Sequence, residues 1–212
     1  MKLIRTSSLT VALAACLITS AIAADEPTAL AVLASSDATL EAKANACDEL
    51  GRVGTTKSVP VLAKLLSDDR LHDYARDGLE RIKDPAAGTA LVDALQTLKS
   101  SQRVGVIISL GDRGDQAAVP ALAKVAKTES KTSGAVGAAL TSLAQIATAE
   151  ATKTILTALA TGDRDSKITA AKAALLAAQR LEKKGDKQSA TQLRKAVSSA
   201  DLPAHIKQAA GQ

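Results

Sequence analysis

The chain has 212 residues, of which 46% are apolar and 23% are charged, and its formal net charge is +5. It contains one Tyr, no Trp and no Phe, while 45 residues are Ala, so small side chains supply most of the apolar content. The apolar share excludes a disordered chain. The scarcity of aromatic rings excludes a cleft that stacks sugars or nucleobases. This length fits one or two domains with a sizeable core.

The first 23 residues have the features of an export signal. Lys2 and Arg5 give a positive start, residues 9–19 form a short apolar run, and residues 21–23 (Ala-Ile-Ala) resemble a cleavage site. The apolar run is too short to span a bilayer as a mature helix. We therefore expect a signal peptide over 1–23 and a periplasmic or secreted protein. Its net charge after cleavage near Ala23 would be about +3, too weak to indicate nucleic acid as a partner.

A lipid anchor is the alternative to a soluble mature chain. Residues 13–16 (Leu-Ala-Ala-Cys) resemble a bacterial lipobox, in which Cys16 would be lipidated and become the first residue. Residues 17–23 would then form an apolar tail after the anchor, where lipoproteins usually have polar linkers, and this favours the soluble form. We expect membrane contact only through a lipid on Cys16 or through the basic C-terminal segment. Cleavage at Ala23 would leave Cys47 without an intrachain disulfide partner.

An internal repeat is the strongest signal in the sequence. Each unit contains a leucine, here called the leading leucine, and the first four stand 29, 31 and 33 residues apart, before a more divergent fifth. The leading leucines are Leu50, Leu79, Leu110, Leu143 and Leu181. Apolar residues also stand twelve residues further on, at Leu62, Leu91, Leu122, Ile155 and Leu193. Such columns in register indicate a repeat architecture.

Each unit has the pattern of two helices joined by a short polar turn. Apolar residues stand four positions before the leading leucines and so share their helix face. Pro60 and Pro120 stand near the start of a second helix, where proline breaks no hydrogen bond. Stacked pairs bury the apolar faces that one pair leaves open. The sequence therefore predicts an all-α fold, a right-handed α-solenoid of stacked helical hairpins with about five repeats.

The repeats also set the expected domain organisation. We expect a linker over 24–36 and four repeats over 37–165. A divergent fifth repeat and a C-terminal helical cap should occupy 166–212. The expected ends of the solenoid are the polar segment 37–41 and the charged last helices, since terminal repeats need a polar outer face.

The repeat pattern resembles a known family. Segments 46–68 (ACDELGRVGTTKSVPVLAKLLSD) and 109–127 (SLGDRGDQAAVPALAKVAK) are similar to HEAT repeats of the short kind, with roughly 30 residues, which also occur in HEAT-like bilin lyases. Segment 71–127 further resembles a version found in exported proteins of planctomycete and verrucomicrobial bacteria. HEAT arrays mostly bind other proteins. The resemblance therefore implies an interaction role and carries over no catalytic residues.

Individual motifs give no indication of catalysis. The chain contains no Gly-x-Ser-x-Gly elbow, no Gly-x-Gly-x-x-Gly loop and no P-loop. His72, near Asp69 and Asp73, is interpreted as part of a solvated helix start and not as a metal ligand. His205 is interpreted as a surface residue. We therefore predict no enzyme and no catalytic, cofactor-binding or metal-binding residues.

Two further features have ordinary structural interpretations. Residues 113–115 spell the adhesion tripeptide Arg-Gly-Asp, but they fall in a turn where Gly and Asp serve the backbone. Cys47 occupies the position of Ile107 and Leu140 in later units, which predicts a small buried side chain.

The second helices are expected to line the concave side of the array, as in HEAT proteins. Charges of both signs alternate along their exposed positions, which favours a protein partner, because a polyanion would need a continuous basic stripe. The predicted partner-binding residues are Lys64, Asp93, Lys124, Lys127, Lys153 and Thr157.

Two functions remain open at this point. The first is an exported, non-enzymatic, monomeric scaffold or adaptor that binds a protein of the cell envelope through its concave face. The alternative is a HEAT-like lyase, or an accessory subunit of one, that handles a pigment or cofactor. The export signal and the scarcity of aromatic residues favour the scaffold.

Overall fold

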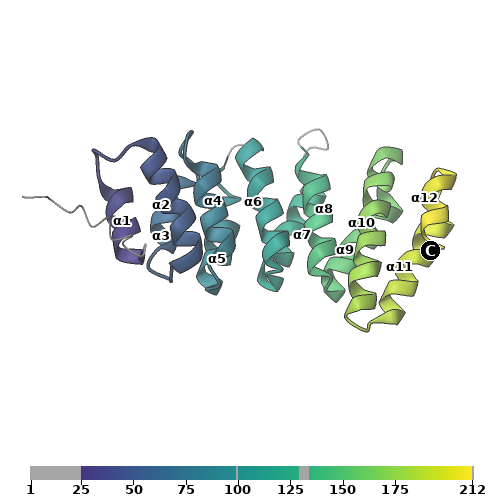
Figure 1. Cartoon of the computed structure of the whole chain (residues 1–212). Coiled ribbons are helices and arrows are strands. Elements are labelled where there is room, and N and C mark those ends of the chain that lie inside the picture. The colour runs from purple at the N-terminus through teal and green to yellow at the C-terminus, as the bar shows by residue number, and fades with distance from the viewer. Residues whose placement is uncertain (1–24, 99, 129–133, 212) are drawn as a thin grey trace, which may run out of the picture.

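The computed structural model describes residues 25–98, 100–128 and 134–211, so the predictions about the signal peptide and Cys16 lie outside the described residues. Across these residues every regular element is a helix, and Figure 1 shows the helices standing side by side in pairs. A single helix, α1 (Glu26–Ala34), precedes the first pair, and α12 (Ala204–Ala209) follows the last. The pairs are α2 (Leu40–Val53) with α3 (Val59–Leu65), α4 (His72–Arg81) with α5 (Pro85–Ala94), α6 (Ser100–Arg113) with α7 (Val119–Thr128), α8 (Ala135–Ile146) with α9 (Ala149–Thr161), and α10 (Arg164–Lys183) with α11 (Lys187–Ser199).

The predicted all-α, right-handed solenoid is confirmed. Each leading leucine lies on the first helix of a pair, and the apolar residue twelve positions later lies on the second helix. All ten side chains are buried in one continuous core, with at most 5% of any of them exposed. Because each pair buries its apolar face against its neighbours, the core runs the whole length of the stack. No helix of the described residues combines the length and apolarity needed to cross a bilayer.

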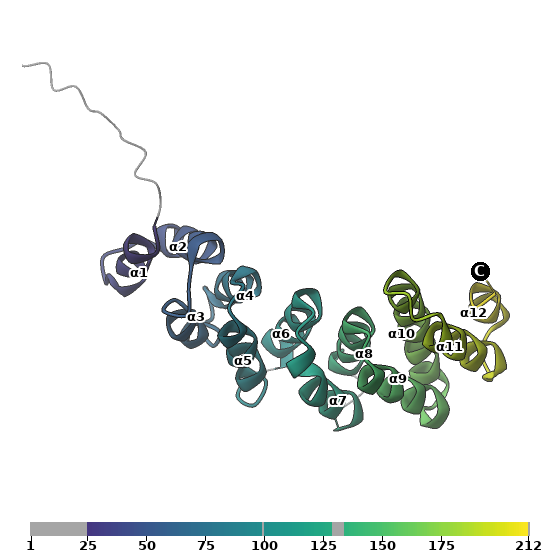
Figure 2. The same ribbon diagram turned by 90° about the horizontal axis from the view of Figure 1, so that it is seen from below.

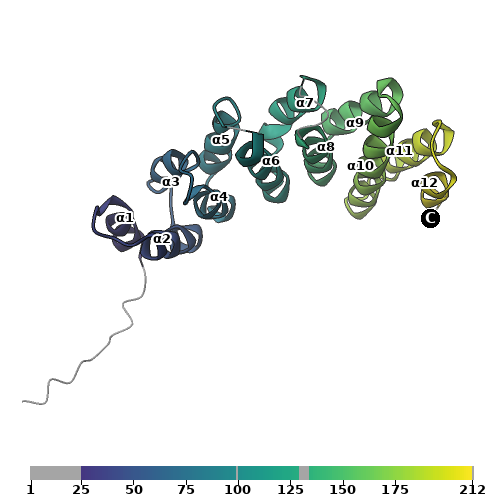
Figure 3. The same ribbon diagram turned by 90° about the horizontal axis from the view of Figure 1, so that it is seen from above.

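The five pairs form a gently curved array. In Figures 2 and 3, which view it from opposite sides, α2, α4, α6, α8 and α10 lie on the concave side, and we call them the inner row. The second helices α3, α5, α7 and α9 lie on the convex side and form the outer row. The prediction that the second helices line the concave side is therefore wrong.

Small residues in the inner row give a physical reason for this direction of curvature. A Cβ atom on Gly78 of α4 would lie 2.9 Å from the carbonyl oxygen of Cys47 on α2. A Cβ atom on Gly111 of α6 would lie 2.6 Å from the Cβ of Ser142 on α8. Glycine at these contacts lets neighbouring inner helices approach closely. The stack therefore bends toward the inner row.

Residues 24–36 were expected to be a linker, but the structure contains helix α1 there. The Glu26 carboxylate accepts hydrogen bonds from the backbone N–H of Thr55 (2.7 Å) and the hydroxyl of Ser58 (2.5 Å), in the turn between α2 and α3. Ala29 is buried against the core, so α1 covers the first pair as a cap. This helix could not be predicted from apolar periodicity, because its apolar residues are distributed around the helix and do not form one stripe.

The contacts of Glu26 predict a dependence of stability on pH. The Ser58 hydroxyl, followed by the Thr55 backbone N–H, lowers the pKa of Glu26 from its ordinary value. This contribution to stability is present above the pKa of the unfolded chain and is lost as the pH falls through the lower pKa of the folded chain. We expect Glu26→Gln to lower the melting temperature at pH 7, and the difference from wild type to shrink below a pH of about 4.

Thermal melts followed by circular dichroism at several pH values test this expectation. The exposed carboxylate of Asp201 provides the control, because Asp201→Asn should leave the melting temperature nearly unchanged at every pH. A Glu26→Gln effect that stays constant down to acidic pH would contradict the assignment of the stabilisation to the ionised carboxylate.

Cys47 occupies a fully buried position in α2, as the sequence predicts. Burial raises the pKa of its thiol to about 11, so almost none of it is thiolate at neutral pH. We expect the native protein to react with a disulfide reagent far more slowly than glutathione, and the chain unfolded in guanidinium chloride to react at once. The measurement uses the Cys16→Ala variant, in which Cys47 is the remaining cysteine. Labelling of the native state at the glutathione rate would refute this.

Candidate functional site

The six predicted partner-binding residues are all exposed and all lie on the outer row. Lys64, Asp93 and Lys124 stand on three successive outer helices. Lys127 and Thr157 line a pocket of about 250 Å³ between α7 and α9. Lys153 and Thr157 line a second pocket, of about 420 Å³, beside α11. The structure thus places the residues on one side as expected, but on the convex side of the array.

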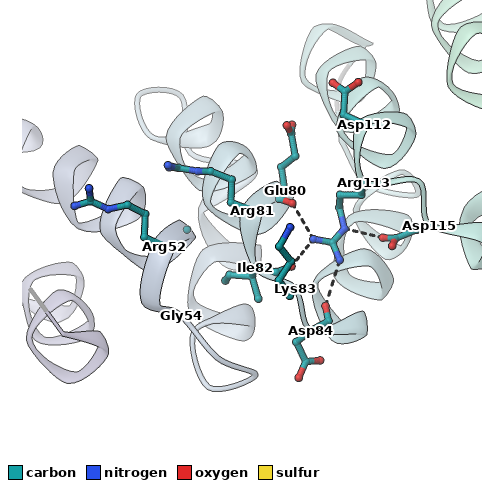
Figure 4. A pocket seen from close by; sticks show the side chains of 11 residues that line it. Arg52, Gly54, Glu80, Arg81, Ile82, Lys83, Asp84, Asp112, Arg113 and Asp115 are labelled. Atoms are coloured by element: carbon teal, nitrogen blue, oxygen red, sulfur yellow. Dashed lines mark hydrogen bonds and ion pairs between the residues drawn. The ribbon is translucent and has the colours of Figure 1, made fainter. Parts of the chain in front are cut away.

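A larger groove, of about 660 Å³, crosses the ends of three inner helices. It lies where α2, α4 and α6 end and the chain turns toward the outer row, and Figure 4 shows its side chains from close by. Sequence reasoning did not find it, because its residues come from three different turns. The lining residues are Gly51, Arg52, Gly54, Glu80, Arg81, Ile82, Lys83, Asp84, Asp112, Arg113 and Asp115.

Arg113 is the most deeply buried charged side chain of this groove, with 6% of it exposed. Its guanidinium donates hydrogen bonds to the carbonyl oxygens of Leu79 (2.8 Å) and Glu80 (2.9 Å) at the end of α4, and to Asp115 (2.6 Å). The last carbonyl groups of a helix have no partner inside the helix and attract a cation. Arg113 therefore ties the third pair to the second, and Figure 4 shows it between the turn after α4 and Asp115.

These contacts also explain the Arg-Gly-Asp tripeptide. Gly114 has φ +70°, a left-handed conformation that glycine adopts without strain. Arg113 and Asp115 on either side of it are paired with each other. The tripeptide is thus occupied in holding the turn, as the sequence interpretation expects.

The remaining charged groups of the groove are suited to binding a polar partner. The Thr56 hydroxyl, the Ala86 backbone N–H and the Arg113 guanidinium together lower the pKa of Asp84, which caps the start of α5. Arg81 donates to the Asp48 side chain (2.6 Å), so its charge is shared with α2. Lys83 is exposed at the centre of the groove. Such a surface can form ion pairs and hydrogen bonds with a polar partner.

The inner row presents a second surface that the sequence analysis missed. The residues two positions before the leading leucines are all exposed and point away from the core: Asp48, Asp77, Ile108, Thr141 and Gln179. Ile108 on α6 is 45% exposed, and Tyr74 on the neighbouring helix α4 is 48% exposed. Their position in the repeat could have identified both residues from the sequence, because both are apolar and lie outside the apolar columns of the repeat.

Acidic side chains accompany Tyr74 on α4. On α4 the Arg76 guanidinium lies 3.6 Å from Asp73, 2.8 Å from Asp77 and 3.3 Å from Glu80. It also donates to the buried Ser109 hydroxyl of α6 at 2.8 Å, which fixes its position. Three carboxylates thus share one guanidinium on the concave side of α4.

His72 belongs to the start of α4 and not to a metal site. Its Nδ1 lies 3.0 Å from the Asp68 carbonyl oxygen, and its Nε2 lies 3.5 Å from Asp73. Within the described residues, no three His, Cys, Asp or Glu side chains gather in a way that could hold a metal ion. The exposed His205 lies on the short last helix α12.

Comparisons with known proteins relate the chain to solved structures by its fold. No family model and no curated protein matches the chain. Among solved structures, the chain is similar to the complex of CpcE and CpcF of phycocyanin lyase from Nostoc sp. PCC7120, with 18% identity and a TM-score of 0.41, over 88% of this chain and 74% of that chain. That structure is a complex of two proteins, and the likeness concerns a HEAT-like helical repeat fold.

The comparison corrects one prediction from the sequence. The chain was predicted not to be an enzyme, on the ground that a helical-repeat fold without catalytic motifs is a scaffold. The comparison contradicts this prediction, because a solved structure with a helical-repeat fold is that of a phycocyanin lyase, so the ground on which the prediction rested does not hold. The absence of familiar motifs therefore does not decide between a scaffold and a lyase subunit.

Proposed function

We propose that this chain binds a protein partner of the cell envelope along the inner row of its solenoid. The observation that carries the proposal is the exposed pair Tyr74 and Ile108 on adjacent inner helices. Nearly all other large apolar side chains of the described residues are buried or half-buried. An apolar pair with a polar rim is typical of the centre of a protein interface.

The repeat geometry supports a protein as the partner. Successive inner helices present side chains from the same register position, at an interaxial spacing of about 8–10 Å. The result is an extended concave surface of the kind that solenoids use for binding. The groove at the ends of α2, α4 and α6 adds charged groups, Lys83 among them, beside this surface.

Site-specific photo-crosslinking in intact cells tests the proposal. A photoreactive amino acid replaces Ile108 in one variant and Lys124, on the outer row, in another. We expect one envelope protein to be crosslinked from position 108 and not from position 124. The proposal fails if the crosslinks form from position 124 alone, or from neither position while both variants retain the helical circular dichroism of the wild type.

The proposal includes export as a soluble monomer, with cleavage after Ala23. In that case the mature chain begins at Ala24 and is found in the periplasm or outside the cell. Intact-mass measurement of the protein purified from the cells that naturally produce it tests this step. A mass that begins at a lipidated Cys16 supports the anchored form, and a mass that includes residues 1–23 contradicts export.

The matched solved structure names a second candidate function, the handling of a pigment or cofactor as a HEAT-like lyase or its accessory subunit. Because the likeness concerns the fold, the test must come from the protein itself. An absorbance spectrum of the protein purified from its natural source decides: a visible band that copurifies supports this candidate. A colourless protein that also leaves added bilin unchanged in absorbance contradicts it.

A further inference from the structure

The exposed side chains of α4 and α6 on the concave side form a small, mixed surface. We call Asp73, Tyr74 and Asp77 of α4 with Ile108 of α6 the inner patch. We propose that the inner patch binds a segment of the partner in which an apolar side chain is flanked by Lys or Arg. This inference rests on the proposed function and adds the chemistry of the partner.

The apolar part of the inner patch sets the first requirement. Tyr74 and Ile108 lie on neighbouring helices of the inner row, five and two positions before their leading leucines. The Arg76 side chain lies between the two helices, with its Cδ 3.1 Å from the position that a Cβ atom on Gly105 of α6 would take. An apolar side chain of a partner that packs on Tyr74 or Ile108 removes apolar surface from water, which favours binding.

The charge of the inner patch sets the second requirement. Arg76 is shared by Asp73, Asp77 and Glu80, so these four side chains carry a net charge of −2. The side chains of Asp73 and Asp77 are 70% and 58% exposed, so both remain accessible to a partner. His72, 3.5 Å from Asp73, adds positive charge only when it is protonated. A cationic side chain on either side of the apolar anchor would complement these carboxylates.

The acidic character is local to the inner patch. The six exposed residues that the sequence singled out on the outer row include four lysines and one aspartate, a net charge of +3. A basic segment is attracted to the inner patch and repelled by that set of residues.

Tyr74 makes the inner patch directly observable. It is the only tyrosine of the chain, and the chain contains no Trp, so intrinsic fluorescence of the full-length protein reports on this one position. The probes are synthetic nine-residue peptides without aromatic residues, in which Lys alternates with Leu, Lys with Ser, or Glu with Leu. We expect a saturable change in Tyr74 emission with the Lys/Leu peptide, and at least tenfold weaker binding of the other two.

Matched variants locate the binding. The double variant Asp73→Asn plus Asp77→Asn should weaken Lys/Leu binding about tenfold, and Ile108→Ser should weaken it by a similar factor. Asp93→Asn removes an exposed carboxylate of the outer row and should leave the affinity unchanged. Circular dichroism confirms that each variant is folded.

Several outcomes would overturn the inference. Equal affinity for the Lys/Leu and Lys/Ser peptides would show that the partner needs no apolar side chain. An unchanged affinity of the double variant for the Lys/Leu peptide would show that the inner patch is not the binding site. Tyr74 emission that changes with protein concentration alone would identify a second copy of the chain as the occupant. If position 108 crosslinks a partner while the peptides do not bind, the proposed function stands and the partner chemistry is wrong. If the peptides bind while position 108 crosslinks no partner, the inner patch has the proposed binding chemistry and the proposed function is wrong.

Discussion

Replacement of Arg113 by alanine is expected to lower the free energy of unfolding by about 3 kcal/mol. The guanidinium donates to the backbone carbonyl oxygens of Leu79, Glu80 and Ile82 at the end of α4. These carbonyl groups cannot bond within their own helix, so they lose their partner when the side chain is removed. Asp115, 2.6 Å from the guanidinium, would lose its counter-ion at the same time.

Urea unfolding followed by circular dichroism measures the change. Arg52→Ala is the matched control, because Arg52 lies in the same groove with 64% of its side chain exposed and pairs with Glu49 of its own helix. An ion pair with an exposed guanidinium contributes little to stability, so the control should unfold almost like the wild type. Similar midpoints for the two variants would show that Arg113 does not join the second and third pairs.

Because Arg113 lies between two pairs of the stack, Arg113→Ala should also change the shape of the unfolding transition. Because each pair contacts only its neighbours, the stability of a solenoid is close to a sum of pair and interface contributions. Weakening the contact between α4 and α6 should therefore broaden the unfolding transition as well as shift it, since the two parts of the stack become less strongly coupled. Arg113→Lys should restore only part of the stability, because an ammonium group cannot bond several carbonyl oxygens in the planar arrangement of a guanidinium.

The sequence determined the fold because the repeat is encoded in single columns of residues. Leu50, Leu79 and Leu110 recur in register, and each is completely buried in the structure. Apolar periodicity reports directly on burial, which is the dominant favourable contribution to folding. The same logic placed Cys47 in the core.

The curvature and the first helix could not be obtained in this way. Which row becomes concave depends on contacts such as that of Gly78 with the Cys47 carbonyl oxygen, between helices far apart in the sequence. Helix α1 has no apolar stripe, and its position depends on the Glu26 contacts with Thr55 and Ser58, which lie 29 and 32 residues away in the sequence. Periodicity contains no information about either.

The candidate site was missed for a related reason. The sequence identified exposed positions correctly, but it assigned the outer row to the concave side, so Lys64 and Lys124 were chosen in place of the inner row. The register itself would have indicated Tyr74 and Ile108, since both interrupt a polar face of the first helices. Their significance appears only when α4 and α6 are seen side by side on the concave side (Figures 2 and 3).

The close contacts of the inner row lead to a second prediction. Replacement of glycine by alanine should lower the free energy of unfolding at Gly111 and raise it at Gly137. We expect Gly111→Ala to lower the free energy of unfolding by about 1–2 kcal/mol, because overpacking exceeds the gain in helix propensity. The new Cβ would lie 2.6 Å from the Cβ of Ser142, whose hydroxyl donates to the Ile107 carbonyl oxygen at 2.8 Å. Ser142 therefore cannot move aside without losing that buried hydrogen bond.

Gly137 provides the matched control on the next inner helix. A Cβ atom there would meet only the Thr169 methyl group, at an ordinary contact distance of 3.6 Å. Gly137→Ala should therefore raise the free energy of unfolding by about 0.5–1 kcal/mol, since alanine favours the helix without a clash. Urea unfolding of both variants measures the two changes. If both substitutions stabilise the protein, the inner helices are not held in contact at Gly111, and close packing of the inner row cannot be the cause of the curvature.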